Sequence, residues 1–255
     1  MSARTDWLVR LRPPSQPLAR LICVPYAGAG ANAFRYWADL LPDWLEPWAV
    51  RLPARETRLA EPPTSRVEQI AAAIAAELRD LVALPYCLYG HSMGALVCFE
   101  LARELRRQSI AQPVHLFVSG RRAPQLPDDL PGICHLPRDA FIAGVRALNG
   151  IPEGVLGEPG LMELIEPALR ADFAVCEGYR FQPQPPLEYG ISAFGGDADP
   201  TTSPGQLAAW REQCAAEFVV RSYPGDHFFV HTEHARILAA ICSDLRSVCP
   251  SIGGQ

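Results

Sequence analysis

A serine bracketed by glycines is the strongest chemical signal in this sequence. Residues 90–94 read Gly-His-Ser-Met-Gly and match the pattern G-x-S-x-G. The pattern follows an apolar run at 86–89 and precedes a helix-forming run at 95–107, which is the strand–turn–helix setting of a nucleophile elbow. Such a turn lifts its serine to a helix N-terminus, where free backbone N–H groups favour developing negative charge. We therefore expect Ser92 to be a nucleophile; the alternative is a plain glycine-rich turn.

A serine hydroxyl needs a base to withdraw its proton. His227 stands in a short loop between a strand predicted at 218–223 and the last predicted helix, and such a loop can reach Ser92 at the carboxyl edge of a sheet. The remaining histidines lie inside the elbow, at the start of a strand, in an irregular stretch, or in or beside the last helix: His91, His115, His135, His231 and His234. We expect His227 to be the base, and His91 to point away from Ser92.

The imidazole in turn needs a carboxylate that holds its tautomer and stabilises its charged form. Two candidates, Asp197 and Asp199, follow a strand predicted at 189–194. We prefer Asp199, because it ends the loop and Pro200 stiffens the chain directly after it. The order serine, aspartate, histidine is also the order expected of α/β-hydrolases. One of the two aspartates is expected to serve only as a turn or cap residue.

Acyl transfer also needs two donors for an oxyanion. The first should be the backbone N–H of Met93, which directly follows the nucleophile. The second should come from the glycine-rich loop at 25–30, which follows a strand predicted at 21–25.

The sequence contains no clear motif for binding a cofactor or a metal ion. The loop at 25–30 lacks the dinucleotide pattern G-x-G-x-x-G, since Ala33 stands where the third glycine would be. Three histidines at helical spacing match no zinc motif: His227, His231 and His234. We expect no cofactor and no metal.

The order of predicted elements indicates the fold. Strands are predicted at 21–25, 48–52, 86–89, 115–119, 189–194 and 218–223, and helices at 65–82, 95–107 and 231–248. The first helix could begin with a capping box formed by Ser65 and Glu68. Strands that alternate with helices predict a mainly parallel sheet with helices on both faces, in the class α/β and of the α/β-hydrolase type.

One long stretch interrupts this alternation. Between Gly120 and Tyr189 lie 68 residues, whereas a parallel crossover needs only a dozen or more. The stretch holds helical patterns at 138–147 and 161–179, and Pro167 should kink or split the second. We expect residues 127–186 to form a helical lid inserted into a core made of residues 1–126 and 187–255. The alternative is extra core helices without a gating role.

Composition limits the remaining function classes. The 255 residues carry a net charge of −5, and all 23 basic residues are arginine. An acidic chain is a poor general binder of nucleic acid, and no apolar run approaches the 18 residues of a membrane span. The eight cysteines are scattered without a C-x-x-C pair, which favours free thiols and a reducing compartment. With no secretory signal at residues 1–14, we expect a cytoplasmic monomer.

Taken together, these segments resemble the type II (external, editing) thioesterases that accompany nonribosomal peptide and polyketide synthases. The resemblance covers nearly the whole chain. It rests on residues 25–28, 51–56, 90–94, 118–124, 169–172 and 224–227, and on Asp199. One departure is Ala29, where a third glycine would be commoner.

The resemblance implies a catalytic triad of Ser92, Asp199 and His227. It also implies oxyanion donors at the N–H groups of Ala27 and Met93, and a lid function for the insert. The implied activity is hydrolysis of aberrant or stalled acyl and aminoacyl groups from the phosphopantetheine arms of carrier proteins. The alternatives are an esterase or medium-chain acyl thioesterase acting on free small molecules and, in another class, a non-catalytic binding module on a hydrolase fold.

A carrier protein is thus the expected partner. Carriers of this kind are typically acidic around the serine that bears the arm. Because this chain is itself acidic, any attraction must be local. Arg121 and Arg122 follow a strand at the same sheet edge as Ser92 and are candidates for docking. Their alternative role is surface solvation or an internal salt bridge.

Overall fold

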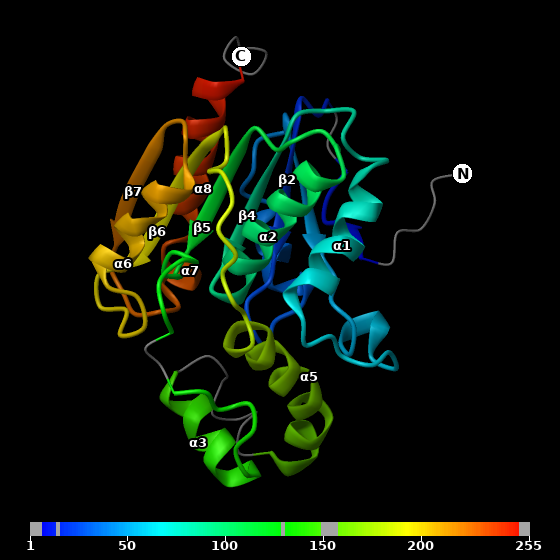
Figure 1. The fold of residues 1–255 in the computed structure, drawn as a ribbon. Coiled ribbons are helices and arrows are strands. Elements are labelled where there is room, and N and C mark those ends of the chain that lie inside the picture. Colours follow the sequence, from blue (N-terminus) through cyan, green and yellow to red (C-terminus); the bar gives the residue numbers. More distant parts are fainter. Residues whose placement is uncertain (1–6, 14–15, 129–130, 149–157, 250–255) are drawn as a thin grey trace.

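The computed structural model describes residues 7–13, 16–128, 131–148 and 158–249. Seven strands form one sheet in the order β1-β3-β2-β4-β5-β6-β7 (Figure 1). The strands are β1 (Leu8–Arg10), β2 (Ala19–Val24), β3 (Leu45–Val50), β4 (Tyr86–His91), β5 (His115–Ser119), β6 (Gly190–Gly196) and β7 (Phe218–Tyr223). All neighbouring pairs are parallel except β1 and β3, so the predicted mainly parallel sheet is confirmed.

Helices cover both faces of this sheet (Figure 1). On one face, α1 (Val67–Leu78) and α2 (Met93–Arg107) pack with α6 (Pro204–Ala208) and the 3₁₀ helix η3 (Ala209–Gln213). On the other, the 3₁₀ helix η1 (Ala31–Trp37) packs with α7 (Phe229–Thr232) and α8 (His234–Val248). A further 3₁₀ turn, η2 (Glu56–Arg58), follows β3. The central strand β4 is buried along its whole length, as expected of a parallel sheet covered on both sides.

The long stretch after β5 carries two helices, α3 (Arg138–Ala147) and α5 (Pro159–Glu177). Both lie beyond one end of the sheet rather than on either face (Figure 1). They share a small core of their own, made of Phe141, Val145, Met162 and Leu169. Residues 129–130 and 149–157 of the expected insertion lie outside the described residues, as do residues 1–6 of the N-terminal stretch.

Several local predictions were wrong. Helix α1 begins after Arg66 and has no side-chain cap, so the predicted box of Ser65 and Glu68 does not form. Helix α5 is continuous, so Pro167 does not split it, and a kink at Pro167 stays a prediction. The last predicted helix is two helices, α7 and α8, which meet at Glu233.

Five elements were missed: strand β1, helix α6 and the three 3₁₀ helices η1, η2 and η3. Strand β1 has only three residues, which is too short for a period of two to be visible. Helix α6 has only five residues, although it begins with a complete capping box between Ser203 and Gln206 that the sequence could have revealed. Among the described residues, no helix combines the length and the apolarity needed to cross a bilayer.

Candidate active site

Ser92 occupies a strained turn between β4 and α2. Its φ of 54° and ψ of −117° lie in a region that few non-glycine residues adopt. The neighbouring glycines allow the backbone to pass closely, because a Cβ on Gly90 would lie 2.1 Å from the Gly94 oxygen and one on Gly94 only 2.2 Å from the Val24 oxygen. The Ser92 N–H donates to the Ser119 oxygen at 2.7 Å, which ties the turn to β5. This is the geometry predicted for a nucleophile elbow.

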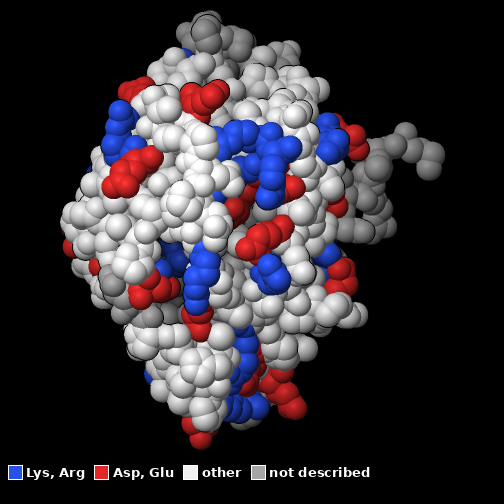
Figure 2. All heavy atoms as spheres, viewed as in Figure 1, with Lys and Arg blue, Asp and Glu red and all other residues white. Residues whose placement is uncertain are grey.

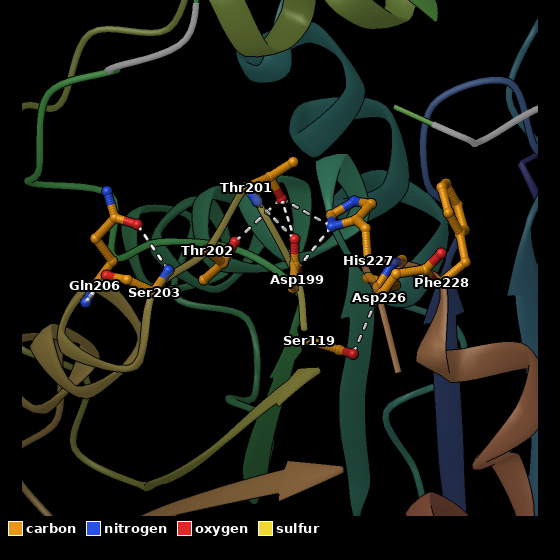
Figure 3. Close-up of polar contacts among 10 residues, drawn as sticks. Ser119, Asp199, Thr201, Thr202, Ser203, Gln206, Asp226, His227 and Phe228 are labelled. Atoms are coloured by element: carbon orange, nitrogen blue, oxygen red, sulfur yellow. Dashed lines mark hydrogen bonds and ion pairs between the residues drawn. The ribbon is translucent and has the colours of Figure 1, made fainter. Parts of the chain in front are cut away.

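His227 is held by a carboxylate and a hydroxyl (Figure 3). Its Nδ1 lies 2.9 Å from Asp199 Oδ2 and 2.9 Å from Thr201 Oγ1. Thr201 also donates to Asp199 Oδ1 from its hydroxyl at 2.7 Å and from its backbone N–H at 2.8 Å. Because a carboxylate can only accept, the proton of the neutral ring sits on Nδ1, and Nε2 keeps a lone pair that can take up a proton.

The Asp199 side chain is fully buried beside this ring. Burial raises the pKa of Asp199, but the hydrogen bond and charge of His227 and the bonds from Thr201 outweigh burial and leave that pKa below its ordinary value. Asp199 is therefore an anion wherever His227 acts as a base. Asp197, the other candidate, instead accepts the backbone N–H of Gly225 at 3.0 Å, which fits the turn role that the sequence offered for one of the two.

Thr201 is a residue of this site that the sequence analysis missed. It follows Asp199 and Pro200, and its hydroxyl lies within hydrogen-bond distance of both His227 and Asp199. A hydroxyl residue two positions after a candidate acid was the available signal, because Asx-type turns close over that spacing.

His91, inside the elbow, is fully buried beneath the His227 ring. The two ring centres lie 4.9 Å apart, and His91 Nδ1 lies 3.0 Å from Ser119 Oγ. Burial, together with the nearby His227 and His231, lowers the pKa of His91 well below its ordinary value. His91 is therefore a neutral packing residue beside the site.

The two expected oxyanion donors lie on elements that border Ser92. Helix α2 begins at Met93, so the N–H of Met93 belongs to the first turn, whose donors lack partners within the helix. Ala27 lies in a tight turn closed by the Ala29 N–H and the Tyr26 oxygen at 3.0 Å. Ala27 and Ser92 line the same cavity.

This cavity has a volume of about 320 Å³ and lies between the sheet edge and the insertion. Ser92, His227 and Thr201 form part of its wall, together with Arg121 and Arg122. The insertion contributes an apolar wall that includes Ile133, Val145, Leu148, Leu169, Phe173 and Cys176. A substrate here would meet a polar reacting end and an apolar chamber.

Metal ligation has a poor basis in the described part of the chain. One group of three potential ligands lies close together there, formed by Cys134, His135 and Glu177. The Glu177 carboxylate, however, already accepts the backbone N–H groups of Ile133 and Cys134, which gives it a structural role. The three histidines that the sequence analysis considered for metal are not such a group.

Comparisons with known proteins agree with this geometry. The model of the family described as "Thioesterase domain" matches residues 19–247. The gramicidin S biosynthesis protein GrsT of Aneurinibacillus migulanus is 45% identical, over 97% of each chain. Among solved structures, the type II thioesterase BorB from the borrelidin biosynthetic cluster superimposes with a TM-score of 0.86 at 33% identity, covering 94% of this chain and 97% of BorB.

A second structure, the type II thioesterase YbtT from the yersiniabactin NRPS/PKS biosynthetic pathway, gives a TM-score of 0.85 at 31% identity, covering 96% and 99%. These likenesses confirm the α/β-hydrolase fold and the resemblance to type II thioesterases that the sequence indicated. The chain therefore belongs to the thioesterase domain family.

Proposed function

We propose that this protein hydrolyses acyl and aminoacyl thioesters on the phosphopantetheine arms of carrier proteins in nonribosomal peptide or polyketide synthesis. The observation that carries the proposal is the joined pair of His227 and Asp199 on the cavity that Ser92 also lines. The names of GrsT, BorB and YbtT, which belong to such biosynthetic systems, support the same conclusion.

The proposed reaction has two stages. In the first, His227 Nε2 takes the proton of Ser92 while Oγ bonds to the thioester carbon, and the N–H groups of Ala27 and Met93 stabilise the oxyanion. The C–S bond then breaks, and the proton passes from His227 to the departing sulfur. In the second stage a water molecule attacks the acyl-serine, His227 takes the proton of the water and returns it to Ser92, and the carboxylic acid leaves.

Asp199 supports both stages without itself reacting. It keeps the His227 ring in the tautomer that leaves Nε2 free, and its negative charge stabilises the imidazolium that forms in each stage. Thr201 donates twice to this carboxylate and so holds it in place.

Docking of the carrier is a finer part of the proposal. Arg122 is only 8% exposed and pairs with Asp128 at 2.5 Å, which is the internal salt bridge considered as its alternative role. Arg121 lines both the main cavity and an adjoining hollow. On the face drawn in Figure 2, acidic and arginine side chains lie beside one another over the sheet and over the insertion. Attraction of an acidic carrier must therefore be local, and we assign it to Arg121.

The test compares one acyl group presented on a holo carrier protein and on N-acetylcysteamine, a free thiol. We expect kcat/KM to be about tenfold or more higher for the carrier-bound acyl group, and this advantage to shrink as salt rises. Equal efficiency on the two substrates, insensitive to salt, would favour the alternative of a hydrolase for free small molecules.

Charge reversal separates docking from chemistry. Arg121→Glu should lower kcat/KM for the carrier-bound substrate by a larger factor than kcat/KM for the free thioester, and so reduce the carrier advantage. Arg79→Glu is the matched control, because Arg79 is an exposed arginine at the C-terminal end of α1, away from the cavity. If both variants lower the carrier advantage alike, general charge rather than Arg121 attracts the partner.

A further inference from the structure

A buried ion pair joins the insertion to the sheet core. Asp172, on α5, is 1% exposed, and its carboxylate receives both guanidinium nitrogens of Arg55, Nη1 at 2.9 Å and Nη2 at 2.8 Å. Arg55 lies in the loop between β3 and η2, far from Asp172 in the sequence. Both residues belong to segments that carry the family resemblance, yet neither has a role in the reaction described above.

The same two side chains also form hydrogen bonds to the turn that contains Ala27. Asp172 Oδ2 accepts the backbone N–H of Gly28 at 2.8 Å, and Arg55 Nη1 donates to the Ala29 oxygen at 2.7 Å. Gly28 has a φ of +80°, as the third residue of a type II turn requires, and a flip of the peptide between Ala27 and Gly28 would point this N–H away from Asp172. The ion pair therefore fixes the turn at its central peptide and at its last residue.

The loop that carries Arg55 is strained on both sides of this residue. Ala54 and Glu56 have positive φ values of 62° and 51°, which non-glycine residues rarely adopt. Glu56 also accepts the Asn32 N–H at 2.9 Å, so the loop is hydrogen-bonded to η1, which follows the turn, as well. Strain of this kind persists where surrounding contacts enforce it and is concentrated at functional sites.

We propose that Arg55 and Asp172 are positioning residues that hold the Ala27 N–H where it can stabilise the oxyanion. The inference rests on the proposed function, since it assumes that Ala27 is a donor. Because Asp172 is part of α5, and α5 also gives Leu169 and Phe173 to the cavity wall, the oxyanion site is complete only while α5 is docked on the core. Helix α5 is thus the anchored part of the insertion.

A purely structural role of the ion pair would lead to a different result. A buried pair that only joins two parts of the fold affects stability, and a single substitution would lower Tm without a selective effect on the transition state. A positioning role lowers kcat and leaves KM nearly unchanged, because the oxyanion exists only in the transition state.

The first experiment measures kcat and KM for hexanoyl-N-acetylcysteamine with Asp172→Asn and Arg55→Lys. Loss of a whole oxyanion donor typically costs a factor of about 10² to 10³, so loosening one should lower kcat by roughly 10- to 100-fold. The control is Glu166→Gln, which weakens the ion pairs of Glu166 with Arg170 in the same helix and with Arg138 in α3, keeps the pair of Arg55 and Asp172, and should leave kcat unchanged.

A second variant guards against loss of the fold. The double substitution Arg55→Met with Asp172→Leu replaces the buried pair by apolar side chains, a change that is often neutral for stability. It still removes the bonds to Gly28 and Ala29, so we expect its Tm to stay close to that of the wild type and its kcat to remain low. A double variant with wild-type kcat would overturn the proposal and leave the ion pair with a purely structural role.

A phenylboronic acid supplies a readout that does not depend on the natural substrate. Its adduct with Ser92 places an oxygen in the oxyanion site, so Asp172→Asn should weaken its binding by the same factor as kcat. Equal inhibition of wild type and variant would also overturn the positioning role. If the wild type cleaves carrier-bound thioesters no faster than Ser92→Ala, the proposed function fails, while the boronate comparison still decides the role of Asp172.

Discussion

The sheet and the insertion form opposite walls of one cavity, but they are built differently. On the sheet side, Ser92 sits in a turn that two glycines and a bond to β5 fix in place, and the Asp199 side chain is fully buried. The insertion side has a small core of four buried apolar residues of its own, and α5 is joined to the main core by Val175 and by the ion pair of Asp172.

This difference assigns different tasks to the two regions. Reacting groups need positions fixed to a fraction of an ångström, which rigid strands and tight turns supply. A wall that must admit an acyl group on a long arm needs a lower cost of opening, and a small core supplies that. We infer that the sheet determines the chemistry and that the insertion, outside its anchor at Asp172, determines access and acyl shape.

The largest expected effect comes from the sheet side. Ser92→Ala should lower the rate of thioester hydrolysis by a factor on the order of 10⁶, because the proposed nucleophile is lost. The side chain adds little packing and the strained turn remains, so Tm should hardly change. Steady-state kinetics and a thermal melt on the purified variant check both points. A variant that keeps more than a few per cent of the activity would show that another residue is the nucleophile.

The next effect distinguishes two neighbouring aspartates. Asp199→Asn should lower kcat by roughly 10⁴, because an amide no longer fixes the His227 tautomer or stabilises its charged form. Asp197→Asn should do far less, since its amide oxygen can still accept the N–H of Gly225. Parallel measurement of kcat for the two variants is the test, and the reverse ranking would move the acid to Asp197.

Acid should weaken the sheet through its buried histidines. Burial, partly offset by Asp244, lowers the pKa of His115 from 6.5 to about 4, and His115 contacts Ser192 at 2.9 Å in the neighbouring strand. As pH falls from 6.5 towards 4, the unfolded chain takes up a proton that the folded protein does not, so the free energy of unfolding falls, by roughly 3 kcal/mol for this residue.

Urea unfolding at pH 7.5 and pH 4.5 measures this loss. His115→Gln should make the difference between the two pH values smaller, while His135→Gln, at an exposed position of the insertion, should leave it as in the wild type. An unchanged difference in the His115 variant would assign the acid sensitivity to other groups, such as His91.

The sequence located elements of both the sheet and the insertion, with α3 at its true bounds, but it predicted helix caps and helix breaks poorly, for a physical reason. Buried parallel strands are short apolar runs bounded by turns, so β5 and β7 were located at their true bounds and β4 within two residues. Helix ends depend on local bonds that several residues can supply. The box predicted from Ser65 and Glu68 therefore failed, and the break between α7 and α8 was not foreseen.

The site shows the same limit. The motif around Ser92 and the loop positions of His227 and Asp199 predicted that these three residues lie close together, because each follows a strand at the same edge of the sheet. The bonds of Thr201 to Asp199 had a local signal in their two-residue spacing, but the contacts of Asp172 depend on how distant segments pack in space. No spacing rule reports that Asp172 would reach a turn 144 residues earlier in the chain.

The smallest expected effect tests the contrast between the two regions directly. Amide hydrogen exchange should be faster in α3, which packs on a small core, than in β4, which is buried along its whole length. Helix α5 should fall between them near Asp172. Phe141→Ala should accelerate amide exchange in α3 further and lower the Tm of the protein only slightly, because Phe141 packs within the insertion. Protection of α3 equal to that of β4 would make the insertion ordinary core helices, the alternative that the sequence left open, and would remove the case for a lid.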